Sequence, residues 1–157
     1  MHVGSGTGYY AAILAELVGR AGRVIAYEID AGLAARATRN LREWGQVTVV
    51  AANGCDLPTR EVDAIFVNCG VTHPAPAWLD ALCNGGRLLV PVTASAEASG
   101  VGTGAMFMIT REHDRFAAAY VSKPWASFLR WRSKRRAERK VTRETESQLA
   151  RGQFDTH

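Results

Sequence analysis

The sequence predicts a doubly wound α/β fold, with a mostly parallel sheet and helices on both of its faces. Three observations support this prediction. A glycine-rich turn at residues 4–8 joins a short apolar segment to an apolar helix. Strand-length apolar runs then alternate with helical segments as far as Val92, and the connections between them are short. Right-handed crossovers between parallel strands place the helices on both faces of such a sheet.

The first elements surround the glycine turn. Residues 1–3 form a strand that is shorter than the usual length of about five or six residues. The helix that follows, residues 11–18, ends at Gly19. The next strand, residues 24–27, leads into Glu28. The large apolar residues of the helix recur at helical spacing: Ile13, Leu14, Leu17 and Val18.

The same patterns predict the rest of the alternating part. An amphipathic helix covers residues 31–44, with its arginines opposite the apolar face. Residues 47–52 are an unbroken apolar run, which is typical of a strand covered on both faces. Two more strands, with a short proline-opened helix between them, complete the series: residues 62–68, a helix that begins near Pro74 and Pro76, and residues 87–92.

The pattern changes after residue 92. Residues 93–104 are rich in Ala, Ser and Gly and predict a loop, whereas residues 105–110 and 116–121 predict an antiparallel hairpin. We therefore expect two parts: a core over residues 1–125, and a charged tail over residues 126–157 that is helical or partly disordered.

Composition limits the classes of protein and site. The net charge of +4 comes from the tail, where the segment from Arg130 to Arg143 contains eight basic residues and one acidic residue, Glu138. The three cysteines form no CxxC pair or Cys/His cluster, which argues against a metal site or a disulfide framework. No signal peptide or membrane-length apolar run is evident, so we expect a cytoplasmic protein.

Four segments should meet at one edge of the sheet, because ligands of doubly wound folds bind beyond the carboxyl ends of the strands. They are residues 4–8, 28–29, 53–54 and 68–73. Glycines let the backbone approach a ligand closely, and the amide groups of the following helix favour an accepting group. The third glycine of the dinucleotide fingerprint is absent, because Tyr9 stands there.

The chemistry of these segments indicates an adenosine-containing ligand. The carboxylate of Glu28 can accept two hydrogen bonds from a ribose diol. A glutamate is also common at an ordinary strand end that faces solvent, so Glu28 alone does not decide between the two. Asn53 and Gly54 can bracket an adenine edge, although Asn-Gly is also simply a good turn. The combination favours adenosine more than either pair does alone.

The sequence resembles the class I S-adenosylmethionine-dependent methyltransferases and, within them, the protein-L-isoaspartate O-methyltransferases. The resemblance rests on HVGSGTGYYAAILAELVG, GRVIAYEID, VVAANG and VDAIFVNCGVTHPAPAWLDALCNGGRLLVPVT. It implies a Rossmann-like methyltransferase sheet of seven strands in which the hairpin supplies the last two. It also implies S-adenosyl-L-methionine as cofactor, and carboxyl O-methylation of isoaspartyl residues in a protein or peptide, or of a diverged acceptor.

The family also implies which residues contact the cofactor. The glycine turn lies along its methionine part, the acidic residue holds the ribose, and the Asn-Gly pair meets the adenine. Carried over to this sequence, the cofactor-binding residues are Gly4, Ser5, Gly6, Tyr9, Glu28, Ile29, Asn53 and Gly54.

Three departures from the family pattern bear on function. The long N-terminal region that precedes the first motif, and most of the first strand, are missing from this sequence. The usual Asp-Gly is Asn53-Gly54, and a glutamine at the sixth strand is replaced by the surroundings of Gly104 and Ala105. We expect cofactor binding to tolerate these changes better than acceptor identity does, and the activity of the truncated chain stays open.

Methyl transfer to a carboxylate needs few catalytic groups, because holding the reactants in line supplies much of the rate. An amine or hydroxyl acceptor would benefit from a base, for which His73 is the candidate, although a plain loop histidine beside Pro74 is the commoner case. Adenine N6 methyltransferases carry Asn-Pro-Pro-aromatic where this chain has residues 68–71, NCGV, which argues against that class.

The tail supports an alternative function. Arginines and lysines from Arg130 to Lys140, with Trp125, Phe128 and Trp131, could contact phosphates and stack on bases. The chain would then be a non-catalytic module that binds RNA or a protein partner. Most such charge runs are solvated helix faces, so nucleic acid is not favoured.

Overall fold

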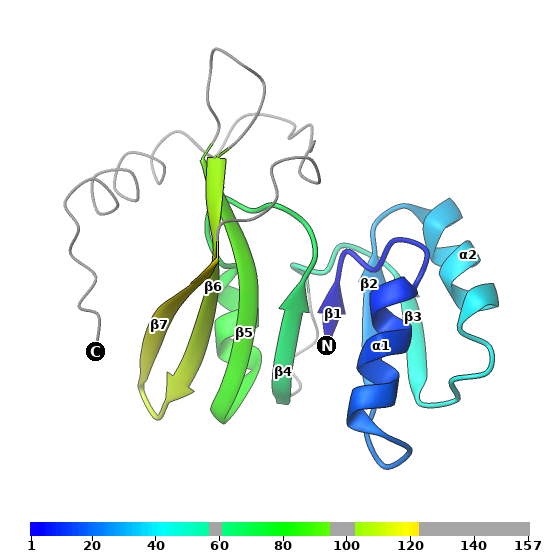
Figure 1. Ribbon diagram of the computed structural model, residues 1–157, viewed down its shortest axis with the longest axis horizontal. Coiled ribbons are helices and arrows are strands. Elements are labelled where there is room, and N and C mark those ends of the chain that lie inside the picture. The colour runs from blue at the N-terminus through cyan, green and yellow to red at the C-terminus, as the bar shows by residue number, and fades with distance from the viewer. Residues whose placement is uncertain (57–60, 95–102, 123–157) are drawn as a thin grey trace.

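The computed structural model describes residues 1–56, 61–94 and 103–122. Within them, one seven-stranded sheet has the order β3-β2-β1-β4-β5-β6-β7. The first five strands are parallel, and β6 and β7 are antiparallel to their neighbours (Figure 1). The predicted mostly parallel, doubly wound sheet with a C-terminal hairpin is therefore confirmed.

The elements follow one another in the predicted order. The strands are β1 His2–Val3, β2 Val24–Glu28, β3 Val47–Ala51, β4 Val62–Val67, β5 Leu82–Ala94, β6 Thr103–Glu112 and β7 Arg115–Ser122. The helices are α1 Tyr9–Val18, α2 Ala31–Asn40 and α3 Pro76–Ala81. From β1 the chain builds the sheet outwards to β3, and it then returns to β4 on the other side of β1. Strand order reverses between β1 and β4, which is where ligands of such sheets bind.

Helices α1 and α2 cover one face of β1–β3 (Figure 1). Small side chains make most of this contact. Ala11 of α1, Ala26 of β2 and Ala37 of α2 are fully buried and form a cluster with Leu41. The larger apolar residues of α1 lie mostly outside this contact, and the side chain of Leu17 is 77% exposed. Alanine at the contact lets the helix approach the sheet closely, so the packed face of α1 is its alanine face.

Helix α3 lies on the opposite face (Figure 1). It packs against the larger of the two hydrophobic clusters. Trp78 is fully buried there, among apolar residues of β1, β4, β5 and β6. Its indole Nε1 donates a buried hydrogen bond of 2.7 Å to the carbonyl oxygen of Gly54. The core is thereby tied directly to the turn after β3.

Some expected boundaries and burials were wrong. No residue of β3 is fully buried, because β3 is an edge strand and not a strand covered on both faces. Helix α2 ends at Asn40, four residues earlier than expected, and β5 begins at Leu82, before the Gly85-Gly86 pair. Both hairpin strands extend beyond their expected ends. No described helix has the length and apolar character needed to cross a membrane.

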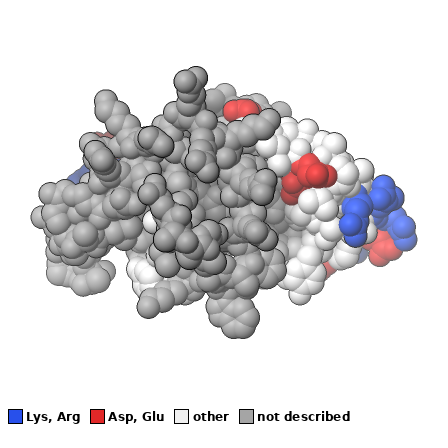
Figure 2. Space-filling model, turned by 90° about the horizontal axis from the view of Figure 1, so that it is seen from above, with Lys and Arg blue, Asp and Glu red and all other residues white. Residues whose placement is uncertain are grey.

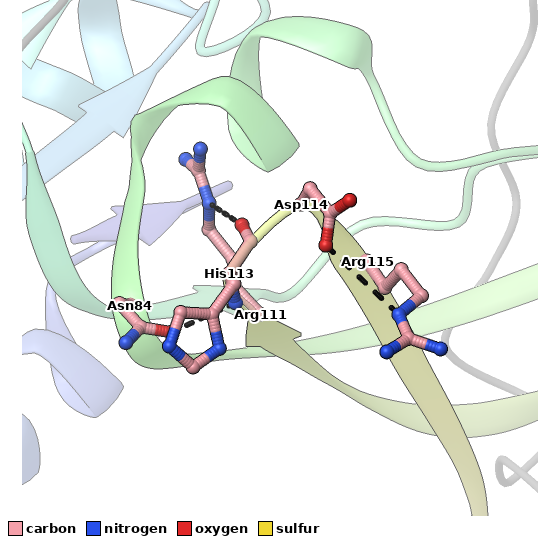
Figure 3. A network of polar contacts seen from close by, with 5 residues as sticks. All are labelled: Asn84, Arg111, His113, Asp114 and Arg115. Carbon is pink, nitrogen blue, oxygen red and sulfur yellow. Dashed lines mark hydrogen bonds and ion pairs between the residues drawn. The ribbon is translucent and has the colours of Figure 1, made fainter.

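A polar network fixes the tip of the β6–β7 hairpin (Figure 3). The Arg111 guanidinium donates to the carbonyl oxygens of Asp80, at 3.2 Å, and Leu82, at 2.7 Å. Its Nε donates to the carbonyl oxygen of His113, and the amide of His113 donates to Oδ1 of Asn84. Arg111 thus satisfies carbonyl groups where α3 ends and joins the hairpin to the start of β5.

Two expectations lie outside the described residues. The loop predicted over residues 93–104 is described only at its ends, which belong to β5 and β6. The basic segment from Arg130 to Lys140 is not described either. The division into residues 1–125 and 126–157, and the proposed binding role of the tail, remain predictions.

Candidate functional site

The glycine turn follows β1 and leads directly into α1. Gly4, Gly6 and Gly8 all have positive φ angles, of 76°, 57° and 96°, a conformation that favours glycine. The amides of Gly4 and Ser5 both donate to the carbonyl oxygen of Tyr27, at 3.0 Å. The turn is therefore fixed against the end of β2.

Glu28 closes the turn from the same strand. Its side chain is only 7% exposed, and its two oxygens accept different backbone amides. Oε2 accepts from the amide of Gly6 at 2.7 Å, and Oε1 accepts from the amide of Asp30 at 3.0 Å. A carboxylate has about four acceptor positions, so each oxygen keeps capacity for one more donor. Glu28 can hold the turn and still bind a pair of hydroxyl groups.

The Asn53-Gly54 turn packs against the same edge of the sheet. The amide of Ala52 donates to the carbonyl oxygen of Glu28 at 3.0 Å. A Cβ atom on Gly54 would lie 2.6 Å from Cγ1 of Val3, so only glycine fits without displacing β1. The turn after β3 and the turn after β1 are therefore neighbours.

The segment after β4 completes the edge. The amide of Asn68 donates to the carbonyl oxygen of Val3 at 2.8 Å. A Cβ atom on Gly4 would lie 3.3 Å from the backbone of Asn68 and from Cβ of Cys69. Burial, with smaller contributions from Cys55 and Glu28, raises the pKa of the Cys69 thiol to about 11. Cys69 therefore stays protonated at neutral pH and is a poor nucleophile.

The structure brings together most, but not all, of the residues that the sequence indicated. Gly4, Ser5, Gly6, Glu28, Asn53 and Gly54 lie along one edge. Tyr9 and Ile29 lie beside them with side chains 70% and 56% exposed, turned to solvent. His73 is exposed, and its Nδ1 lies 3.0 Å from the hydroxyl of Thr72.

Ser5 shows a feature that the sequence could not reveal. Its hydroxyl is buried, and within the described residues it has no hydrogen-bond partner. A buried hydroxyl without a partner is costly, and a ligand group in the turn could satisfy it.

Sequence reasoning missed two residues that shape the Asn53-Gly54 turn. Trp78 holds the carbonyl of Gly54, and Asp56 contacts Asn53. The spacing Asn-x-x-Asp across a turn was the available signal for Asp56. No sequence signal pointed from α3 to the turn after β3.

The surface at the carboxyl ends of the strands is seen in Figure 2. In the described part of this view, most of the surface is uncharged, acidic side chains form separate patches, and a basic cluster lies at the far end. Within the described residues seen in this view, the basic side chains gather at that end and form no broad basic surface of the kind that favours nucleic acid.

Comparisons with known proteins agree with one another. The family model for protein-L-isoaspartate(D-aspartate) O-methyltransferase matches residues 1–122. A protein-L-isoaspartate O-methyltransferase of Korarchaeum cryptofilum is 40% identical over 104 residues, covering 59% of this chain and 47% of the relative. One of Thermotoga maritima is 33% identical over 96 residues, covering 59% and 30%. The chain spans about half, or less, of the length of these relatives.

Solved structures show the same likeness. A protein-L-isoaspartate O-methyltransferase has a TM-score of 0.71 at 26% identity, covering 84% of this chain and 41% of its own. A second structure, from Plasmodium falciparum, is titled a putative protein-L-isoaspartate O-methyltransferase in complex with S-adenosyl-L-homocysteine. It has a TM-score of 0.63 at 18% identity, covering 83% and 65%, and supports the fold alone.

Proposed function

Because the chain belongs to the protein-L-isoaspartate(D-aspartate) O-methyltransferase family, we propose that it methylates the free carboxylate of isoaspartyl residues in proteins or peptides, or the carboxylate of a diverged acceptor. S-adenosyl-L-methionine is the proposed methyl donor. The observation that carries the proposal is the contact between Glu28 and Gly6, which joins the glycine turn after β1 to the end of β2, next to the β1–β4 pair where strand order reverses. Repair of damaged proteins in the cytoplasm is the proposed role.

The described residues fit this cofactor. The positive φ angles of Gly4, Gly6 and Gly8 let the backbone of the turn approach the amino-acid end closely, and the buried hydroxyl of Ser5, which has no partner among the described residues, belongs to the same turn. Glu28 keeps acceptor capacity on both oxygens for the two ribose hydroxyls. Asn53 and Gly54 stand one strand further along, where the adenine would reach.

The cofactor supplies a methyl group on a positively charged sulfur, and the chain has to place an acceptor in line with it. An isoaspartyl carboxylate is already a nucleophile, so orientation is the main requirement and no base is needed. Cys69 is not a competing acceptor, because its raised pKa keeps it protonated. His73 becomes relevant as a base only for an amine or hydroxyl acceptor.

Binding and transfer can be tested separately. Calorimetry with S-adenosyl-L-homocysteine should show binding to the wild-type chain and a loss of about tenfold or more in Glu28→Ala, which removes charge-assisted hydrogen bonds. Glu43→Ala is the matched control, because Glu43 is exposed and lies before the opposite end of β3, and its ion pair among the described residues is with the exposed Arg42. Equal affinities for the wild type and both variants would contradict the proposed site.

Transfer should be measured with two peptides that differ only in one residue, isoaspartate in one and aspartate in the other. We expect methyl incorporation into the isoaspartyl peptide alone. Binding of the cofactor product without transfer to either peptide would contradict the proposed acceptor and leave the cofactor site standing.

A further inference from the structure

We propose that Asp56 provides the acceptor that recognises the exocyclic amino group of adenine in this chain. The proposal rests on the proposed function, because it assumes an adenosyl ligand at this edge of the sheet. It begins from the side chain of Asn53, which is the first residue of the Asn53-Gly54 turn and carries no charge.

The contacts of Asn53 fix the orientation of its amide group. Oδ1 accepts from the backbone amide of Cys55 at 3.1 Å, and Nδ2 donates to Oδ2 of Asp56 at 2.9 Å. The reverse orientation would set two donors against each other at Cys55 and two acceptors against each other at Asp56. The oxygen of Asn53 is therefore directed into its own turn.

Asp56 is better suited to accept from a ligand. Its Oδ2 is used by Asn53, whereas for Oδ1 no contact is recorded among the described residues. The side chain is exposed, so a ligand can reach it. The amino group of adenine offers two N–H donors, and an ionised carboxylate is the stronger kind of acceptor for them.

The turn that carries Asp56 is firmly anchored. The amide of Asp56 donates to the carbonyl oxygen of Asn53 at 3.1 Å, which closes the turn. Gly54 packs against Val3 and accepts the indole hydrogen bond of Trp78. A carboxylate held at the end of such a turn costs little further ordering when it binds a ligand.

A second explanation is that Asp56 only stabilises the turn through Asn53. The two explanations differ in ligand selectivity. A turn-stabilising residue would affect every nucleoside ligand equally, whereas an acceptor for the amino group would distinguish adenosine from inosine, in which a carbonyl oxygen replaces that group.

The test compares S-adenosyl-L-homocysteine with S-inosyl-L-homocysteine by calorimetry on the full chain. The wild type should prefer the adenosyl ligand by about tenfold or more, because the inosyl carbonyl would face a carboxylate. Asp56→Ala should remove this preference. Asp114→Ala is the matched control, since Asp114 is an exposed carboxylate at the hairpin tip, and it should keep the wild-type preference.

Asp56→Asn gives the sharper result and preserves the shape of the turn. Its amide oxygen would be taken by Nδ2 of Asn53, so its own NH2 group would face the ligand. This NH2 group would be repelled by the amino group of adenine but could donate a hydrogen bond to the carbonyl oxygen of the inosyl ligand. The preference should therefore shift towards the inosyl ligand. Thermal melting without ligand should show that the variant folds.

The outcomes separate the two proposals. No binding of either ligand to the wild type would overturn the proposed function and the role of Asp56 with it. Adenosyl binding with unchanged selectivity in both Asp56 variants would overturn the role of Asp56 alone. Equal losses for both ligands would assign Asp56 to the turn and would also overturn its recognition role.

Discussion

His2 makes the stability of this fold depend on pH. Its side chain is fully buried on β1 and stacks on Phe66, with ring centroids 5.2 Å apart. Neither ring nitrogen has a hydrogen-bond partner among the described residues. Burial, with a smaller contribution from the N-terminal ammonium, lowers the pKa of His2 from 6.5 to about 4. The folded state therefore keeps this imidazole neutral.

The sign and size of the effect follow from this difference in pKa. Between pH 6.5 and pH 4 the unfolded chain takes up a proton on His2 that the folded chain does not, so stability falls as pH falls through this window. Each pH unit is worth about 1.4 kcal/mol, and the full window about 3 kcal/mol. Above pH 6.5 the contribution is complete and constant.

Urea unfolding at a series of pH values between 7.5 and 4 would measure this loss. His2→Phe is the matched variant, because it keeps an aromatic ring against Phe66 and cannot take up a proton. Carboxylates titrate in both chains, so the difference between the two curves isolates His2. The wild type should lose about 2 to 3 kcal/mol more than the variant on acidification. Parallel curves would refute the reasoning.

Three more predictions concern other contacts. Gly54→Ala should cost about 1 to 3 kcal/mol in urea unfolding, because its Cβ would clash with Val3; an unchanged midpoint would contradict this. Arg111→Gln should cost about 1 to 3 kcal/mol, because it loses the hydrogen bonds to the end of α3, whereas Arg115→Gln should be neutral. Cys69 should resist iodoacetamide at pH 8 when folded and react in urea, because its pKa is raised to about 11; equal rates would contradict this.

The alternation of elements could be predicted because it is written in local patterns. Glycine after a strand, proline before a helix and apolar runs of strand length predicted the succession of strands and helices along the chain, and the resemblance implied that the hairpin supplies the last two strands. The packing of α1 could not be predicted in this way. Its large residues follow helical spacing as well as its alanines do, and only the closeness of the sheet selects Ala11 and Ala15 as the buried face.

Part of the candidate site could also be predicted from local patterns, and part could not. The glycine turn and Glu28 follow consecutive predicted strands, and they meet in the structure because parallel strands end at the same edge of the sheet. Asp56 and Trp78 could not be found so easily, because each is connected to the site by a hydrogen bond to Asn53 or Gly54 that only the folded structure reveals. The acceptor side has no comparable pattern, and the exposed His73 does not supply one.

The short β1 does not weaken the glycine turn as its length suggests. β1 pairs with β2 on one side and β4 on the other, and the amides of Phe66 and Asn68 donate to carbonyl oxygens of Met1 and Val3. The position of the turn is thus set by its neighbours more than by its own strand. The side chain of Glu28 also holds the turn directly, because it accepts a hydrogen bond from the amide of Gly6. Because the carboxylate that holds the turn is also the proposed ribose acceptor, we expect ligand binding and the stability of this edge to be coupled. An adenosyl ligand should then raise the melting temperature by an amount that grows with the logarithm of its concentration relative to its Kd.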